Sequence, residues 1–220
     1  MVRRQLSDEV ATHLRQSIMA GELAPGASVR AELVGEQLDV SATPVREALH
    51  ALRAEGFLDL VPRKGFTVRP MDASDIRDIF TAHALIAGEL TARAADAATG
   101  DQVAGLEAVH RALMAAAAAG NTAKLDELND EFHRLVYLAA GSERLRWVLG
   151  NFVKYVPGAF YEQIEGWPEA TAADHSAIFD AIATKDSAGA REAMAQHIRN
   201  AGERLAEHFA SRQPSEQPTD

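Results

Sequence analysis

Hydrophobic residues in the first third of the chain recur every three or four positions within three separate segments. This spacing places them on one face of a helix, so each segment is predicted to form an amphipathic helix. Ser7 and Ser41 stand where the first and third helices should begin and are expected to cap them, and Pro44 fits the first turn of the third. The three predicted helices are 6–21, 32–38 and 41–56.

Two short apolar runs follow, and turn-forming residues bound them. The runs, 57–61 and 66–69, have the length and composition of β-strands. The hairpin between them contains Arg63, Lys64 and Gly65, and Gly65 can adopt the positive φ that a tight turn requires. Three helices followed by a two-stranded ribbon predict a winged helix-turn-helix, which combines helices with a small sheet.

Beyond residue 70 the apolar pattern is helical throughout, interrupted by Gly, Pro and short polar segments. It predicts an all-α bundle of about six helices, with Asp72 or Ser74 able to cap the first. The predicted helices are 75–97, 102–119, 122–139, 143–164, 168–184 and 187–210. The chain is therefore expected to be mainly α, with these parts: a domain at 1–70, a linker at 71–74, a helical domain at 75–210 and a disordered tail at 211–220.

Charge is distributed unevenly between the two predicted domains. The net charge is −10, yet residues 1–70 hold nine basic and nine acidic residues, whereas 71–220 hold 13 and 23. An acidic C-terminal part disfavours non-specific binding to polyanions, so DNA binding would need an asymmetric basic face on the N-terminal domain. The chain contains no cysteine, which excludes disulfides and thiolate chemistry. It has no signal-like or membrane-spanning apolar run, so a cytoplasmic protein is expected.

The N-terminal domain resembles the winged helix-turn-helix of GntR-family transcription regulators. The matching segments read IMAGELAPG (18–26), SATPVREAL (41–49) and LRAEG (52–56). The resemblance covers the whole domain and implies a regulator that binds double-stranded DNA. Its third helix would be the recognition helix, which enters the major groove with its N-terminal residues against the base edges.

Several residues are candidates for contact with DNA. Arg46 is the best base-reading candidate, because a guanidinium group can bind O6 and N7 of guanine together. Ser41 and Thr43 suit phosphate contacts near the N-terminus of the helix. The other candidates are Arg30, which matches a family position that contacts DNA, and Arg63, Lys64 and Gly65 at the tip of the wing.

Two observations qualify this interpretation. Many relatives carry Arg where this chain has Ala42, so one DNA contact is expected to be missing and the preferred operator to differ. The alternative is a winged helix that binds only protein, with Arg46 held in an ion pair by Glu47 or Glu55 of its own domain.

The C-terminal domain resembles the FCD-type effector domain of FadR-like regulators. The matching segments are NDEFH (129–133) and LAAGS (138–142), and the number and order of the helices also agree. The resemblance implies a ligand-responsive homodimer, and this homodimer is expected to act as a repressor. A two-fold dimer would bind a pseudo-palindromic operator, and the expected effector is a small organic acid.

Five of the eight histidines fall on apolar helix faces: His83, His110, His133, His175 and His197. A buried histidine must be hydrogen-bonded or ligated, and each taken singly is more simply a core residue. The family resemblance implies more, namely that Asn129, His133, His175 and His197 hold a divalent metal. Zinc is expected first for a histidine-rich site, with nickel or manganese as alternatives.

Two departures from the family affect this expected site. Asn129 replaces a commoner Asp, so the ligands would all be neutral, the metal would be retained less tightly, and it would attract an anionic effector more strongly. His83 and Ala87 stand where relatives often carry Arg and Glu, which puts a simple copy of the family's carboxylate site in doubt. His83 could donate a hydrogen bond to an effector or could be a packed core residue.

Two other functions remain open at this point. Three histidines can hold a catalytic metal, but no phosphate loop or nucleophile motif accompanies them. Asp130, Glu131 and Asp174 lie beside the predicted ligands, yet their helical angles indicate that they face outward. The chain is therefore expected not to be an enzyme. The third possibility is a helical domain that only dimerises and binds no ligand.

Overall fold

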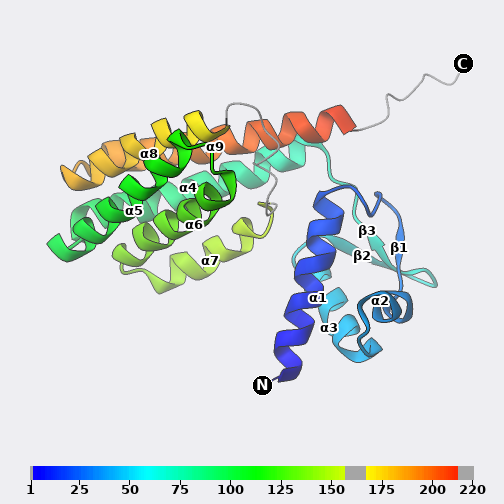
Figure 1. Cartoon of the computed structure of the whole chain (residues 1–220). Coiled ribbons are helices and arrows are strands. Elements are labelled where there is room, and N and C mark those ends of the chain that lie inside the picture. Colours follow the sequence, from blue (N-terminus) through cyan, green and yellow to red (C-terminus); the bar gives the residue numbers. More distant parts are fainter. Residues whose placement is uncertain (1, 157–166, 213–220) are drawn as a thin grey trace, which may run out of the picture. The chain divides into compact units, whose positions relative to one another are not determined.

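The computed structural model describes residues 2–156 and 167–212, which form two compact units, Met1–Met71 and Asp72–Asp220. The described residues contain nine helices and three short strands, as expected for a mainly α protein with one small sheet (Figure 1). A disordered tail was expected at 211–220, but α9 continues to Arg212. The remaining residues of that expected tail, 213–220, lie outside the described residues. No described helix is long and apolar enough to cross a membrane.

The N-terminal unit is a winged helix-turn-helix. Helix α3 packs against α1 and α2, and its buried residues form the core of this unit with Phe57 and Leu58. The sheet is antiparallel with the strand order β1-β3-β2. The elements are α1 (Val2–Met19), β1 (Ser28–Val29), α2 (Ala31–Leu38), α3 (Ala42–Ala54), β2 (Leu58–Val61) and β3 (Gly65–Val68).

Two local predictions for this unit are corrected, and one short strand was not predicted. Helix α1 begins at Val2, so Ser7 is a buried residue within the helix and does not cap it. Ser41 occupies the N-cap position of α3 as predicted, but its side chain makes no capping hydrogen bond. Strand β1 was not predicted; it is only two residues long, and its pairing of Val29 with Phe66 depends on tertiary contact and not on a local pattern.

The turns of the unit require particular backbone conformations. Asp39, between α2 and α3, has a φ of 53°, and a Cβ on Gly35 would lie 2.7 Å from the carbonyl oxygen of Val40. Glycine at position 35 therefore allows the close approach that sets the helix-turn-helix. At the wing tip Gly65 has the predicted positive φ, 79°, and Arg63 also has a positive φ of 66°.

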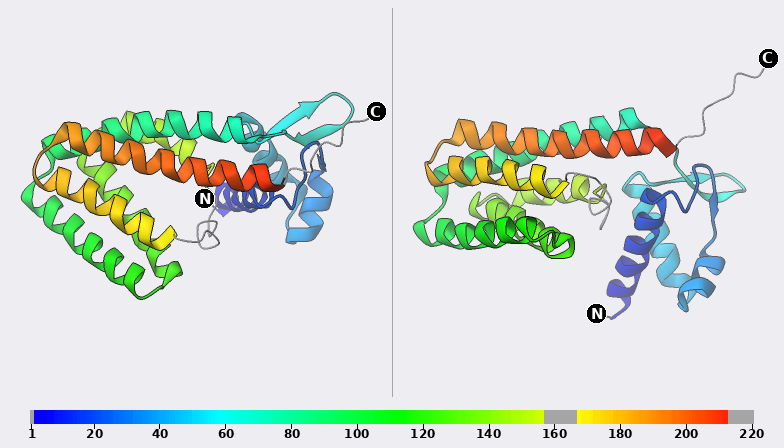
Figure 2. Two further views of the ribbon diagram at one scale, coloured as in Figure 1. Left: turned by 90° about the horizontal axis from the view of Figure 1, so that it is seen from above. Right: turned by 45° about the horizontal axis from the view of Figure 1, so that its top comes forward.

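The C-terminal unit is a helical bundle in which α4 and α9 run side by side (Figure 2). Helix α8 packs against α9, and α5 packs against both α6 and α8. Asp72, one of the two expected caps, forms a capping box with Asp75 at the start of α4. The helices are α4 (Ala73–Ala97), α5 (Gly100–Ala118), α6 (Thr122–Ala139), α7 (Glu143–Val153), α8 (Trp167–Ala183) and α9 (Ser187–Arg212).

Helix α7 is shorter than the predicted segment 143–164. The backbone tightens after Val153, where the amides of Tyr155 and Val156 bond to carbonyls three residues earlier. The next residue in the sequence is Pro157, and proline disfavours the helical conformation of the residue that precedes it. The rest of the predicted segment, 157–164, lies outside the described residues.

Two glycines allow α4 and α9 to approach closely. A Cβ on Gly88 would lie 2.9 Å from the carbonyl oxygen of Arg191, and one on Gly202 would lie 2.4 Å from the Cβ of Phe80. The absence of side chains at these positions brings the two backbones together along the bundle. Phe80, His83 and His197 are thereby brought to one region of the domain.

Candidate functional site

All seven predicted DNA-contact residues are exposed in the N-terminal unit. Val45, Ala48, Leu49 and Leu52 form the buried face of α3, which turns the polar face with Arg46 toward solvent. The predicted set therefore lies on the helix ends and the turn of the wing: Arg30, Ser41, Thr43, Arg46, Arg63, Lys64 and Gly65.

Arg46 is ion-paired with a residue that the sequence did not indicate. Its guanidinium lies 2.6 Å from the carboxylate of Glu32 on α2, and both side chains are more than 60% exposed. The backbone and then Arg46 lower the pKa of Glu32 through hydrogen bonds, so this carboxylate is ionised near neutral pH. The alternative partner Glu55 instead binds Arg15 at 2.8 Å. An exposed ion pair contributes little to stability, so Arg46 can exchange its partner.

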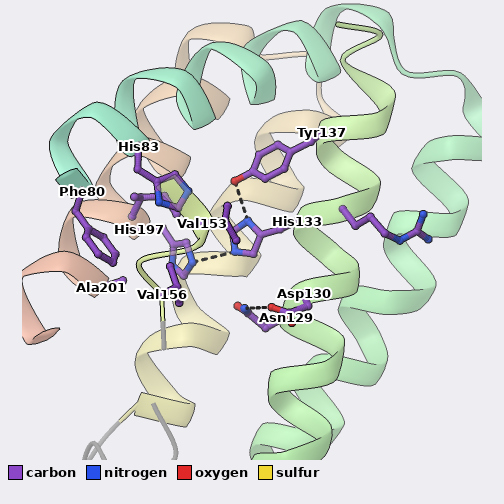
Figure 3. A pocket seen from close by; sticks show the side chains of 12 residues that line it. Phe80, His83, Asn129, Asp130, His133, Tyr137, Val153, Val156, His197 and Ala201 are labelled. Atoms are coloured by element: carbon purple, nitrogen blue, oxygen red, sulfur yellow. Dashed lines mark hydrogen bonds between the residues drawn. The ribbon is translucent and has the colours of Figure 1, made fainter. Parts of the chain in front are cut away.

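Three histidines of the C-terminal unit form a cluster. His133 on α6, His175 on α8 and His197 on α9 place possible ligand atoms within 4.8 Å of one another. The Nε2 atoms of His133 and His197 are 3.2 Å apart, and the rings of His175 and His197 have centroids 4.7 Å apart. Figure 3 shows His133 and His197 facing each other at the edge of a pocket.

The outer nitrogen of each ring has a partner of its own. His175 Nδ1 lies 2.7 Å from the carbonyl oxygen of Thr171, to which it can only donate. His197 Nδ1 lies 3.1 Å from the Asp174 carboxylate, and His133 Nδ1 lies 3.2 Å from the Tyr137 hydroxyl. Such partners fix the orientation of metal-binding histidines and leave Nε2 available as the ligand.

Two buried polar atoms at the cluster lack a hydrogen-bond partner among the described residues. They are Nε2 of His175 and Oδ1 of Asn129, which precedes His133 by one helical turn. An unsatisfied buried acceptor is costly, and a cation would satisfy both atoms. Three imidazole nitrogens and one amide oxygen are suitable ligands for a divalent transition metal, so the residues present fit the expected ion.

Burial keeps two rings of the cluster, those of His133 and His175, in the neutral state that a metal requires. Burial, reinforced by the neighbouring His197, lowers the pKa of His175 to about 3 and that of His133 well below its ordinary value. Both rings are therefore neutral near pH 7, with a lone pair free on one nitrogen.

The acidic neighbours of the ligands behave differently from one another. The expectation that Asp174 faces outward is wrong, because its half-buried carboxylate contacts His197. Asp130 lines the pocket beside Asn129, whose amide nitrogen is 3.5 Å from its carboxylate, and burial raises the pKa of Asp130. Glu131 instead forms an ion pair with Arg134.

The cluster opens into a cavity of about 290 Å³. His83 lies in its wall, is 4% exposed, and its Nδ1 has no hydrogen-bond partner among the described residues. Burial lowers the pKa of His83 to about 4. This residue was predicted as either an effector contact or a core residue, and its position in the wall is compatible with the first role.

The sequence profiles of two families match the chain, the bacterial regulatory proteins of the gntR family over residues 6–68 and the FCD domain over 78–200. The chain is 35% identical to the Nta operon transcriptional regulator of Aminobacter aminovorans over 127 residues, which cover 56% of this chain and 59% of that protein. It is 28% identical to the transcriptional repressor RspR of Escherichia coli, over 86% of this chain and 84% of RspR.

A solved structure agrees with these sequence relatives. The structure of E. coli McbR/YncC has a TM-score of 0.70 and 25% identity, and the match covers 93% of this chain and 98% of that one. The fold and these matches define a winged-helix DNA-binding protein with an all-helical C-terminal domain. The chain belongs to the GntR family of bacterial transcription regulators, in the group that carries an FCD domain. These relatives are regulators and not enzymes.

Proposed function

We propose that this GntR-family regulator is a homodimeric repressor whose helical domain senses a small organic acid through a bound divalent metal. The observation that carries the proposal is the histidine cluster, in which three rings have their Nδ1 atoms oriented by partners and Nε2 atoms directed to a common space. The partnerless Nε2 of His175 and Oδ1 of Asn129 support the proposal, because a bound cation would satisfy both acceptors.

His133, His175, His197 and Asn129 would hold the metal, with zinc expected first and nickel or manganese as alternatives. The bound ion would supply a positive charge that binds an effector carboxylate. Asp174 would orient the ring of His197, and Tyr137 and Thr171 would orient the other two rings.

The operator would be recognised by α3. Arg46 would exchange Glu32 for a guanine edge, while Ser41, Thr43 and Arg30 contact phosphates. The wing tip, with Arg63, Lys64 and Gly65, would reach the adjacent backbone or minor groove. The name of RspR, a repressor, supports the proposed sign of regulation.

With a second copy of the chain, the regulator would bind a pseudo-palindromic operator, because a two-fold dimer presents two related recognition helices. Two large hydrophobic side chains on the helical unit support self-association. Leu85 on α4 is 65% exposed and Trp147 on α7 is 72% exposed, and these two helices pack against each other. Exposed apolar residues of this size are typical of protein interfaces.

The metal assignment is tested on protein purified without chelators or metal-affinity resin. Elemental analysis should find a divalent transition metal in the wild-type protein and much less in His133→Ala. His110→Ala is a suitable control, because His110 lies outside the cluster and its ring stacks on Phe179. Wild-type metal content in His133→Ala would show that the assignment is wrong.

The DNA assignment is tested by selecting fragments of the source genome with the purified protein and sequencing them. Enrichment of a short two-fold symmetric sequence is expected. Enrichment of an asymmetric site would contradict the proposed binding of a dimer to a two-fold symmetric operator. The absence of any enriched sequence when metal has been restored would contradict it as well.

A further inference from the structure

A second pocket, lined by residues of α6 and α7, adjoins the cavity beside the histidine cluster. Each has a volume of about 290 Å³, and both are lined by Arg134, Tyr137 and Val153. The hydroxyl group of Tyr137 is 3.2 Å from Nδ1 of His133, as Figure 3 shows. This side pocket therefore begins next to the proposed metal ligands. It adds four residues of α7 and its C-cap to the shared three: Arg146, Leu149, Gly150 and Lys154.

The charged side chains of the side pocket are all cationic. Among the described residues, Arg134, Arg146 and Lys154 line it and no acidic residue does, whereas the first cavity contains Asp130. Arg134 pairs with Glu131 of its own helix, but both side chains are exposed, so a ligand can replace Glu131. A carboxylate or phosphate matches the donors of a guanidinium group. The side pocket therefore favours an anionic group.

Helix α7 and its C-cap place two of these cations on one face, with a glycine between them. Arg146, Gly150 and Lys154 are spaced four residues apart, which puts them along the same side of a helix. A Cβ on Gly150 would meet no atom within 4 Å. The absence of a side chain there leaves open space that a ligand group can enter between the two cations.

We infer that the side pocket binds a second anionic group of the effector; this rests on the proposed function, which places the first carboxylate at the histidine cluster. Arg146 and Lys154 bind the second group, a carboxylate or a phosphate, and Arg134 joins them by leaving Glu131. The body of the ligand lies beside Tyr137, where the two pockets meet. The effector is then a small acid with an anionic group at each end.

Straight-chain diacids and the monoacids of the same length measure the contribution of the second group. A water molecule occupies about 30 Å³ of the liquid, so 290 Å³ accommodates about ten non-hydrogen atoms, the size of adipate. Diacids from succinate to suberate, with monoacids from butanoate to octanoate, bracket this size. An acid that ends in a phosphonate group distinguishes phosphate from carboxylate as the second group.

Calorimetric titration of zinc-loaded full-length protein at pH 7.5 compares these acids. At least one doubly anionic acid should bind about tenfold more tightly than the monoacid of its length, because charged hydrogen bonds replace the contacts of a methyl group. If every doubly anionic acid binds no more tightly than its monoacid, the inference is overturned.

Arg146→Gln tests one of the assigned cations, and Arg144→Gln is its matched control. Both arginines are exposed on α7, but Arg144 does not line the side pocket. Arg146→Gln should weaken binding of the preferred diacid about fivefold while monoacid affinity and zinc content stay at the wild-type level. Arg146→Lys keeps the positive charge and should lose less, and Arg144→Gln should lose nothing. Equal losses for diacid and monoacid in Arg146→Gln, or wild-type affinity for both, would overturn the assigned contact.

Gly150→Leu tests the space without removing a charge. The leucine side chain would occupy the gap between Arg146 and Lys154, so the diacid should lose its advantage while the monoacid still binds. Gly105→Leu, the same change at an open position of α5, should keep the wild-type preference. An unchanged preference for the diacid in Gly150→Leu would show that the ligand does not enter the side pocket.

Elemental analysis of the same samples separates this inference from the proposed function. Protein that takes up no zinc, or zinc-loaded protein that binds none of the acids, contradicts the proposed function and the inference with it. Zinc-loaded protein that binds the monoacids but gains nothing from a second anionic group contradicts the side pocket alone.

Discussion

The recognition helix and the histidine cluster are built in opposite ways. On α3 the functional side chains are exposed and close together in the sequence, and Arg46 has an exposed partner that it can leave. The cluster draws on three helices and is mostly buried, and it leaves acceptor atoms without partners. Exposed functional groups can act with little effect on folding, whereas ligands of buried groups should stabilise the fold that positions them.

Removal of the proposed metal gives the sharpest test of this contrast and the largest expected effect. A ligand present at a thousand times its dissociation constant stabilises a fold by about 4 kcal/mol, so a chelator should markedly lower the melting temperature of the helical unit. Loss of helical circular dichroism follows the unfolding of this unit, which contains six of the nine described helices. Hydrogen exchange over 31–54 should not change.

His175→Ala provides the control for metal removal. It should melt at the same temperature with and without chelator, because its site has already lost a ligand. A chelator that leaves the wild-type melting temperature unchanged, with the metal shown to be gone, would contradict the coupling of the cluster to the fold.

The stability of the N-terminal unit should instead be sensitive to substitution of a glycine at which two backbone segments are closely packed. In Gly35→Ala the new Cβ would meet the carbonyl oxygen of Val40, so we expect a loss of about 1–3 kcal/mol in unfolding free energy and weaker operator binding. Gly105→Ala is the matched control. Gly105 lies in α5 with no atom near the new Cβ, and alanine should stabilise this helix by about 0.5–1 kcal/mol.

Denaturant unfolding and operator titration measure both glycine variants. If Gly35→Ala is as stable as the wild type and binds the operator normally, the close approach between α2 and the following turn does not determine the helix-turn-helix geometry.

The same contrast explains how much the sequence could predict. Helix α3 and the wing follow from local periodicity and turn residues. The seven candidate DNA contacts came from the resemblance to GntR regulators together with the chemistry of these side chains. Strand β1 was missed because two residues carry no periodic signal. No local pattern brings His133, His175 and His197 together, since their contact depends on the packing of three helices; the family resemblance alone proposed this set.

The misplacement of Asp174 has a specific physical cause. Consecutive residues on a helix point about 100° apart, so Asp174 and His175 were not expected to face the same neighbour. Helix α8 packs against α9, and His197 lies where both adjacent positions reach it. The angle on one helix cannot show this, because the position of the second helix decides which side chains meet.

Arg46→Ala should reduce operator binding without affecting the fold. Loss of a bidentate base contact costs about 1–3 kcal/mol of binding free energy, and an exposed residue on α3 should leave the melting temperature unchanged. Titration at fixed salt against the selected operator and against a variant with one guanine replaced measures the effect. Equal affinity of wild type and Arg46→Ala for the operator would remove Arg46 from the set of base-reading residues.

Glu32→Gln should have the smallest effect, and it distinguishes two roles of the ion pair. If Glu32 only holds Arg46 in the absence of DNA, the variant should bind the operator up to about threefold more tightly, because no pair has to be broken and one negative charge near the phosphates is gone. If Glu32 instead positions Arg46 for a guanine edge, affinity should fall and discrimination between the operator and its guanine variant should decrease. We expect the first result, because both side chains are exposed and the pair is easily exchanged. Reduced discrimination in Glu32→Gln would show that the surface site, like the buried cluster, depends on an orienting carboxylate.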